Sequence, residues 1–154
     1  MSNYNSTQWG YIFPATPPQT ELKPYEQSGK VRTAYAAYST PVAGLTAGDN
    51  LYVCKLPQGA RVLNLEALVP AGFVTSAAKV GYGTVAADGT VTVVDDDRWG
   101  TGIDLSAVGR KQFLITPADM DYVTTSEVAV VLNFTTGNPA GSKDIAILVQ
   151  YVVE

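Results

Sequence analysis

The segment EVAVVLNFTTGNPAGSKDIAILVQYVV, residues 127–153, decides the fold class of this chain. Its two ends, residues 127–134 and 144–153, are the longest runs rich in Val, Ile, Leu and aromatic residues, which are typical of β-strands. The stretch Gly137-Asn-Pro-Ala-Gly141 separates them and consists of residues that favour turns. We therefore expect the two strands to form a hairpin joined by this loop.

Shorter strand-like runs fill the sequence between residue 30 and this pair. Asp88-Gly89 predicts a tight hairpin turn between two of them. The glycines of KVGYGTV, residues 79–85, predict a bulge or a close approach of a neighbouring backbone. Thr116 followed by Pro117 predicts one capped helical turn. The additional predicted strands cover residues 31–38, 51–56, 61–69, 79–85, 90–94 and 112–115.

About eight short strands separated by turns, with no sustained helical periodicity, predict an all-β, jelly-roll-like β-sandwich over residues 30–154. The alternating run 61–69 illustrates the pattern, because one face of a strand collects every second residue. There the apolar face is expected to hold Leu63, Leu65, Ala67 and Val69, and the polar residues include Arg61, Asn64 and Glu66.

Residues 1–29 differ in composition from this body. They contain four prolines and five aromatic residues but few aliphatic ones, so they predict an extended segment without a core of its own. We expect an N-terminal arm whose rings bind another chain, because aromatic side chains bury large areas at interfaces. Packing on the arm's own body and plain disorder are the alternatives. The aromatic residues are Tyr4, Trp9, Tyr11, Phe13 and Tyr25.

The residue counts argue against catalysis. The chain has no histidine, which excludes Ser-His-Asp and Cys-His nucleophilic sites and histidine-based zinc sites. The single cysteine, Cys54, cannot form an intrachain disulfide or a thiolate metal site, and we interpret it as a small core residue. We therefore expect no enzymatic activity, no cofactor and no bound metal.

Charge and hydropathy narrow the expected partners and location. The net charge of −4 disfavours nucleic-acid binding, which requires a basic surface. No run of about 18 apolar residues is present, so no membrane segment is expected. The first ten residues, MSNYNSTQWG, lack the charged and apolar regions of a signal peptide, so we expect synthesis in the cytoplasm.

The densest charge cluster lies at residues 86–104, whose five acids and one base carry the same net charge as the whole chain. Asp95, Asp96 and Asp97 are expected on an exposed loop that faces solvent or a basic patch on a partner. Calcium binding and a glycosidase carboxylate pair are weaker alternatives, because the spacing and opposed geometry they require are absent. Arg98 and Trp99 complete the candidate partner-binding segment, although a buried tryptophan at a sheet end is an equal alternative for Trp99.

From about residue 29 to the end, the chain resembles the capsid decoration or cement proteins of tailed bacteriophages. The resemblance rests on GKVRTAYAAYSTP at 29–41, GDNLYVCKLPQGARVLNLEALV at 48–69, KVGYGT at 79–84, DDDRW at 95–99 and ILVQYVVE at 147–154. It implies a jelly-roll-like sandwich on the outer surface of the virion head. It further implies the major capsid protein as partner, stabilisation of contacts between its subunits, and self-association in which a trimer is favoured over a dimer.

Two other functions stay open at this point. A carbohydrate-binding or fibre module of a phage tail or head would use exposed aromatics beside carboxylates, for which Tyr82, Trp99 and Asp95–Asp97 are the candidates. Another minor virion component, such as a tail or adaptor protein, would share the fold and differ in copy number. Residues 1–29 fall outside the resemblance, so their role as an arm rests on composition alone.

Overall fold

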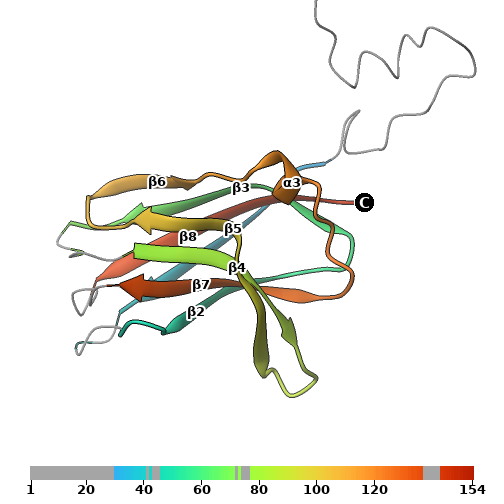
Figure 1. Cartoon of the computed structure of the whole chain (residues 1–154), viewed down its shortest axis with the longest axis horizontal. Helices are drawn as coiled ribbons and strands as arrows, with labels where there is room; N and C mark the ends of the chain where they lie inside the picture. The colour runs from blue at the N-terminus through green and yellow to red at the C-terminus, as the bar shows by residue number, and fades with distance from the viewer. Residues whose placement is uncertain (1–29, 41, 43–45, 72, 74–76, 137–142) are drawn as a thin grey trace, which may run out of the picture.

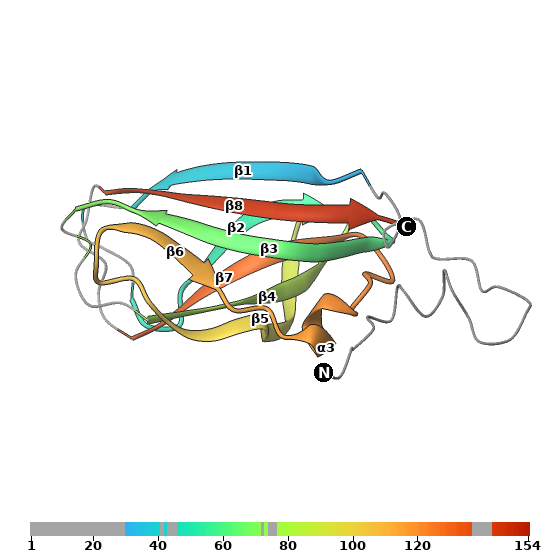
Figure 2. The ribbon, with the colours of Figure 1, turned by 90° about the horizontal axis from the view of Figure 1, so that it is seen from above.

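The fold is seen in a computed structural model that describes residues 30–154 apart from 41, 43–45, 72, 74–76 and 137–142. These described residues form two four-stranded antiparallel sheets packed face to face (Figures 1 and 2). The elements are β1 (Arg32–Ser39), β2 (Asn50–Leu56), β3 (Ala60–Val69), β4 (Ala77–Val85), β5 (Val91–Asp104), β6 (Gly109–Phe113), α3 (Pro117–Met120), β7 (Val128–Thr136) and β8 (Asp144–Val153).

The strand orders are those of a jelly roll. One sheet runs β1-β8-β3-β6 and the other runs β2-β7-β4-β5. Each strand of the first half of the chain pairs with its counterpart in the second half, as in one long hairpin wrapped into two sheets. The pairs are β1 with β8, β2 with β7, β3 with β6 and β4 with β5. The all-β sandwich of eight strands predicted from the sequence is confirmed.

The expected β7–β8 hairpin is wrong. β7 lies between β2 and β4 in one sheet, and β8 lies between β1 and β3 in the other. Both strands are central, and their long apolar runs reflect burial by neighbours on both sides. By contrast, the β4–β5 hairpin at Asp88-Gly89 is confirmed, with Ala86 N–H donating to the Thr90 carbonyl across the turn.

The core fills the space between the two sheets, and its largest side chains are fully buried. The largest are Trp99, Phe73, Phe113, Phe134, Leu56, Leu65, Leu105 and Leu132. Each such side chain contributes roughly 1.5–3 kcal/mol relative to exposure. The predicted apolar face of β3 is correct from Leu65 onward but not at Leu63. A bulge between Val62 and Asn64 shifts the alternation, so Val62 enters the core instead.

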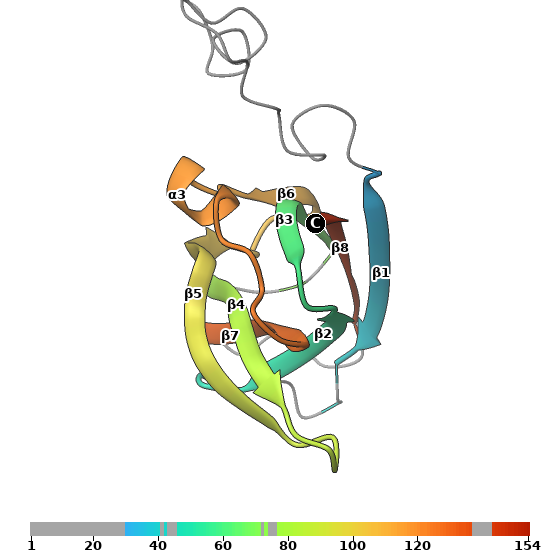
Figure 3. The ribbon, with the colours of Figure 1, turned by 90° about the vertical axis from the view of Figure 1, so that its right-hand side faces the viewer.

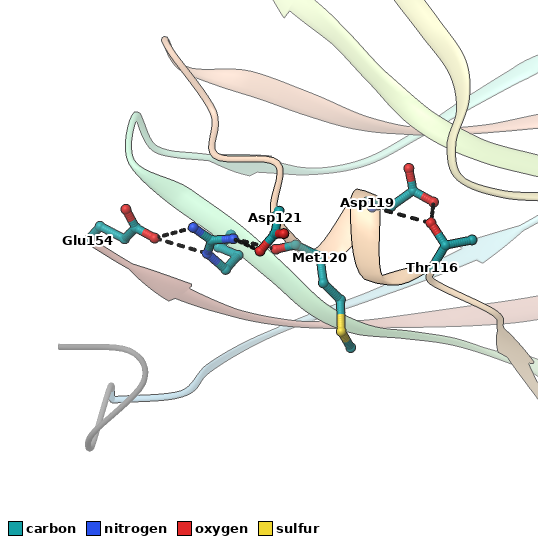
Figure 4. Close-up of polar contacts among 6 residues, drawn as sticks. Thr116, Asp119, Met120, Asp121 and Glu154 are labelled. Carbon is teal, nitrogen blue, oxygen red and sulfur yellow. Dashed lines mark hydrogen bonds and ion pairs between the residues drawn. The ribbon is translucent and has the colours of Figure 1, made fainter. Parts of the chain in front are cut away.

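Arg61 is a buried charge that the sequence reading treated as an ordinary polar position. Its side chain is only 5% exposed. Its guanidinium donates to Glu154 Oε1 from Nη2 at 2.6 Å and from Nε at 2.9 Å. Nη1 donates to the Met120 carbonyl at 2.7 Å and lies 3.3 Å from Asp121 Oδ1 (Figure 4). These contacts join β3, the C-terminal end of α3 and the residue that follows β8.

The short helix α3 has the cap predicted from Thr116-Pro117. Thr116 is extended, and its hydroxyl accepts from the Asp119 N–H, while Pro117 takes the first helical position (Figure 4). Among the described residues, no helix reaches the length and apolarity that a membrane span requires.

Candidate interaction surfaces

The acidic segment lies in a strand, which corrects the expected exposed loop. Asp95, Asp96 and Asp97 belong to β5, whose fourteen residues oppose the nine residues of β4. The five extra residues are absorbed by three register shifts, and the largest falls between the pairs Tyr82–Asp95 and Val80–Gly100. The three aspartates therefore lie in a bulged part of β5, where successive side chains do not alternate regularly between the two faces of the sheet.

The glycines of β4 make this bulge possible. A Cβ on Gly81 would lie 1.9 Å from the Asp95 carbonyl oxygen and 2.7 Å from the Asp96 carbonyl carbon. A Cβ on Gly83 would lie 2.7 Å from the Thr92 oxygen. The close backbone approach predicted from the two glycines is thus confirmed. Beyond this crossing the distal parts of β4 and β5 leave the sandwich as a projecting hairpin (Figures 1 and 3).

The three consecutive aspartates have different surroundings. Asp97 is exposed, and its backbone N–H donates to Asp95 Oδ1 at 3.3 Å. Asp96 pairs with Lys79 of β4 at 3.2 Å, with both side chains partly exposed. Within the described residues no group of three acidic, cysteine or histidine side chains is placed to hold a metal ion. The segment offers a partly neutralised acidic edge, and its role in partner binding stays a prediction.

Trp99 is fully buried, which agrees with the interpretation of a buried tryptophan and not with that of an exposed partner-binding residue. Its ring packs against Tyr82 and Tyr122, with centroid distances of 5.9 and 6.3 Å. Its indole Nε1 is buried without a hydrogen-bond partner among the described residues. A buried ring cannot serve as a flat platform for a sugar or as an interface anchor, so Trp99 no longer supports the carbohydrate-binding alternative.

Arg98 lies at the surface of the same cluster. Its guanidinium carbon sits 4.6 Å from the centroid of the Tyr122 ring, and its Nε lies 3.8 Å from Asp119 Oδ1. Tyr82 and Tyr122 are stacked at 5.1 Å. Burial, followed by the hydrogen bond and charge of Tyr82, raises the pKa of Tyr122 above its ordinary value. The cluster therefore fastens the bulged part of β5 to the segment after α3.

Cys54 behaves as a small packing residue, as predicted. It lies on β2, is partly buried and packs against the core cluster. Burial raises the pKa of its thiol to about 11, which keeps it protonated at neutral pH. A thiol of this kind is a poor nucleophile, because the thiolate is the reactive form.

A surface that the sequence reading missed lies on the outer face of the β1-β8-β3 part of the first sheet. Side chains from these three strands border a groove of about 260 Å³. The groove is lined by Tyr35, Ala37, Leu68, Val69, Pro70, Asp144, Ile145 and Ala146. The signal was present in the alternation of β1, where every second residue is exposed. The alternation alone could not predict a groove, because the groove forms only when β1, β8 and β3 become neighbours.

Farther along this face the surface becomes polar. The Asn64 amide donates to Gln150 Oε1 at 3.3 Å, the Gln112 amide donates to Asn64 Oδ1 at 3.0 Å, and Arg110 pairs with Glu66 at 3.2 Å. These cross-strand contacts satisfy one another and set the boundary of the apolar groove. The predicted arm residues Tyr4, Trp9, Tyr11, Phe13 and Tyr25 lie outside the described residues.

Comparison with known proteins finds similarity of fold. No family model and no curated protein matches the sequence. Among solved structures, a chain of the capsid of Ralstonia phage GP4 matches with a TM-score of 0.64 at 18% identity, covering 93% of this chain and 92% of that one. A chain of the cyanophage Pam1 capsid asymmetric unit matches with a TM-score of 0.56 at 22% identity, covering 92% of this chain and 100% of that one.

A third match comes from the acid-stable capsid structure of Helicobacter pylori bacteriophage KHP30. Its TM-score is 0.54 at 18% identity, and it covers 80% of this chain and 87% of that one. All three matches extend over most of both chains, so the likeness concerns the whole sandwich and not a shared fragment. The chain therefore has a jelly-roll fold that also occurs in chains of bacteriophage capsid structures.

Proposed function

We propose that this chain is a bacteriophage virion structural protein that decorates the outer surface of the head and stabilises contacts between major capsid subunits. The observation that carries the proposal is the likeness in fold, over 80–93% of this chain, to chains from three phage capsid structures. The resemblance of five sequence stretches between residues 29 and 154 to decoration proteins supports the same function.

The surface of the sandwich suits a protein that acts by binding. Large apolar side chains remain exposed at more than one place on the body, including Tyr35 at 64% and Val94 at 55%. They lie on β1 and β5, which belong to different sheets, so more than one side of the domain can contact a neighbour. A protein that bridges capsid subunits requires at least two such contact areas.

The mechanism is linkage between binding and stability. A protein that binds only the assembled lattice stabilises it by RT ln(1 + [L]/Kd), and many symmetric sites add their effects. The exposed acidic edge of β5 would face a basic patch of the capsid. The arm, residues 1–29, would reach a neighbouring subunit and bury aromatic rings there. Association into a trimer would place three such arms around one symmetry axis.

The copy number in purified particles tests this function. Virions from the source of this chain would be purified on a density gradient, and the molar ratio of the chain to the major capsid protein measured by quantitative mass spectrometry. A decoration protein should be present at on the order of hundreds of copies, because it occupies every equivalent lattice site. A few copies per particle would instead indicate a tail or adaptor component, and absence from particles would refute a virion role.

A reconstitution experiment then separates decoration from mere incorporation. Particles stripped of the chain should release DNA at a lower temperature than complete particles, and adding back the purified full chain should restore the higher temperature. The gain should saturate with added protein, because the lattice has a fixed number of sites. Particles whose release temperature does not depend on the chain would contradict a stabilising role.

A further inference from the structure

The outer groove of the first sheet is built by three neighbouring strands in register. Ala37 of β1 pairs with Ala146 of β8, and Leu68 of β3 pairs with the same alanine from the other side. Tyr35 lies two residues from Ala37 and so projects from the same face. Tyr35 is 64% exposed and Leu68 is 39% exposed, so small alanines form the floor between two larger, uncovered side chains.

The size of the groove indicates the kind of occupant. Its volume of about 260 Å³ is below the roughly 300–1,000 Å³ that is typical of small-molecule sites. Of its main lining residues only Asp144 is charged, and Tyr35, Leu68 and Pro70 offer apolar contact. A space of this size and character fits one or two aromatic or proline side chains presented by a polypeptide.

The chain itself contains a segment of that chemistry. Residues 1–29 hold five aromatic residues and four prolines, and they span roughly 95 Å if extended. They enter the body at β1, the strand that supplies two side chains to the groove. Arg32 at the start of β1 pairs with Tyr151, whereas Ala37 in the groove pairs with Ala146. Residues 1–29 therefore join β1 at the end that lies away from the groove of the same copy, which favours the groove of a second copy as their receptor.

We infer that the N-terminal arm of one copy docks in the β1-β8-β3 groove of a second copy. This inference deepens the proposed function, on whose interchain arm it rests, by naming the receptor of the arm. Docking of each arm on the next copy links subunits in a ring if the rotation closes, which is how a trimer would form. The groove residues Tyr35 and Leu68 and the arm residue Trp9 are the contacts that the test addresses.

The test uses the purified full chain, whose two tryptophans report on different places. Trp99 is fully buried in the core, so acrylamide quenching of tryptophan emission reports mainly on Trp9. Light scattering gives the mass over the same dilution series. Docking in a second copy predicts that the mass falls toward the monomer's 16.3 kDa on dilution and that the quenchable fraction rises at the same concentrations.

Matched variants show whether the groove is the receptor. Tyr35→Ser and Leu68→Lys should each move the transition to about tenfold or more higher concentration, as expected for loss of a central aromatic or apolar contact. Tyr52→Ser removes a tyrosine of similar exposure from β2 in the opposite sheet and should leave the transition unchanged. Circular dichroism confirms that all three variants are folded.

Three outcomes would overturn the inference. The first is a quenchable fraction that is low but independent of concentration in a monomer, which indicates docking on the arm's own body. The second is a Trp9 that is fully quenchable at every concentration. The third is a transition that Tyr35→Ser and Tyr52→Ser shift equally. These experiments use no virions, so a failure of the docking inference leaves the virion role open to its own copy-number test. In the same way, absence of the chain from virions would not decide whether the arm docks in the groove of a second copy.

Discussion

Replacing Gly81 by alanine should destabilise the protein strongly, because the space that the new methyl group needs is occupied by backbone. The added Cβ would lie 1.9 Å from the Asp95 oxygen and 2.8 Å from the Asp95 carbonyl carbon. Ordinary contacts begin near 3.4 Å, so β5 would have to move by about 1.5 Å. Overpacking a core typically costs about 1–3 kcal/mol. A backbone carbonyl cannot rotate aside as a side chain can, so we expect about 3 kcal/mol or more.

Urea unfolding followed by circular dichroism measures this cost. For a chain of this length, 3 kcal/mol corresponds to a fall in Tm of roughly 6–12 °C. Gly83→Ala should cost less, because one of its close neighbours is the Val91 side chain, which can move. Gly89→Ala meets no atom within 4 Å but has a φ of +85°, so only the backbone penalty of about 1–2 kcal/mol applies. A Gly81→Ala protein no less stable than Gly89→Ala would refute the tight crossing of β4 and β5.

Three further predictions concern side chains. Arg61→Met should lower the free energy of unfolding by about 2–3 kcal/mol in urea titrations, because charge-assisted hydrogen bonds are lost from a buried position. Glu154→Gln should lower it by only about 1 kcal/mol, because Glu154 is partly exposed. Equal losses of stability in the two variants would contradict this difference in burial. Arg98→Met should cost about 1 kcal/mol through loss of the contact with the Tyr122 ring, and no change by the same titration would argue against that contact. Cys54 should react with a disulfide reagent at pH 8 roughly 100-fold more slowly in the folded than in the urea-unfolded chain, because its folded pKa of about 11 exceeds its ordinary 9.0. Since the raised pKa favours the protonated thiol, its contribution to stability is complete below about pH 9 and is lost as the pH rises through 11; equal reaction rates would contradict the burial.

The sequence predicted those features that depend on local chemistry. The Asp88-Gly89 turn, the cap at Thr116, the close approach at Gly81 and the positions of most strands are set by residues near one another in the chain. Turn residues, capping hydroxyls and glycines act over a few positions, so their effect is visible before folding. The class of fold followed from their number and spacing.

The features that depended on distant partners were missed or wrong. Which sheet receives β7 and which receives β8 is decided by pairing across the whole chain, so two adjacent strong strands were wrongly joined as a hairpin. The burial of Arg61 depends on Glu154, 93 positions away. Trp99 enters the core because bulges in β5 reset its alternation. The groove on the outer face required three strands to become neighbours.

We propose that copies of this jelly roll form a repeated outer layer of a phage head. The most direct measurement is an electron cryomicroscopy reconstruction of purified particles from the source of this chain. We predict sandwich-shaped density, with strand orders β1-β8-β3-β6 and β2-β7-β4-β5, at every equivalent position on the outside of the shell and across boundaries between capsid subunits. A bare outer shell, with density for this chain confined to the tail or to the interior, would contradict the claim.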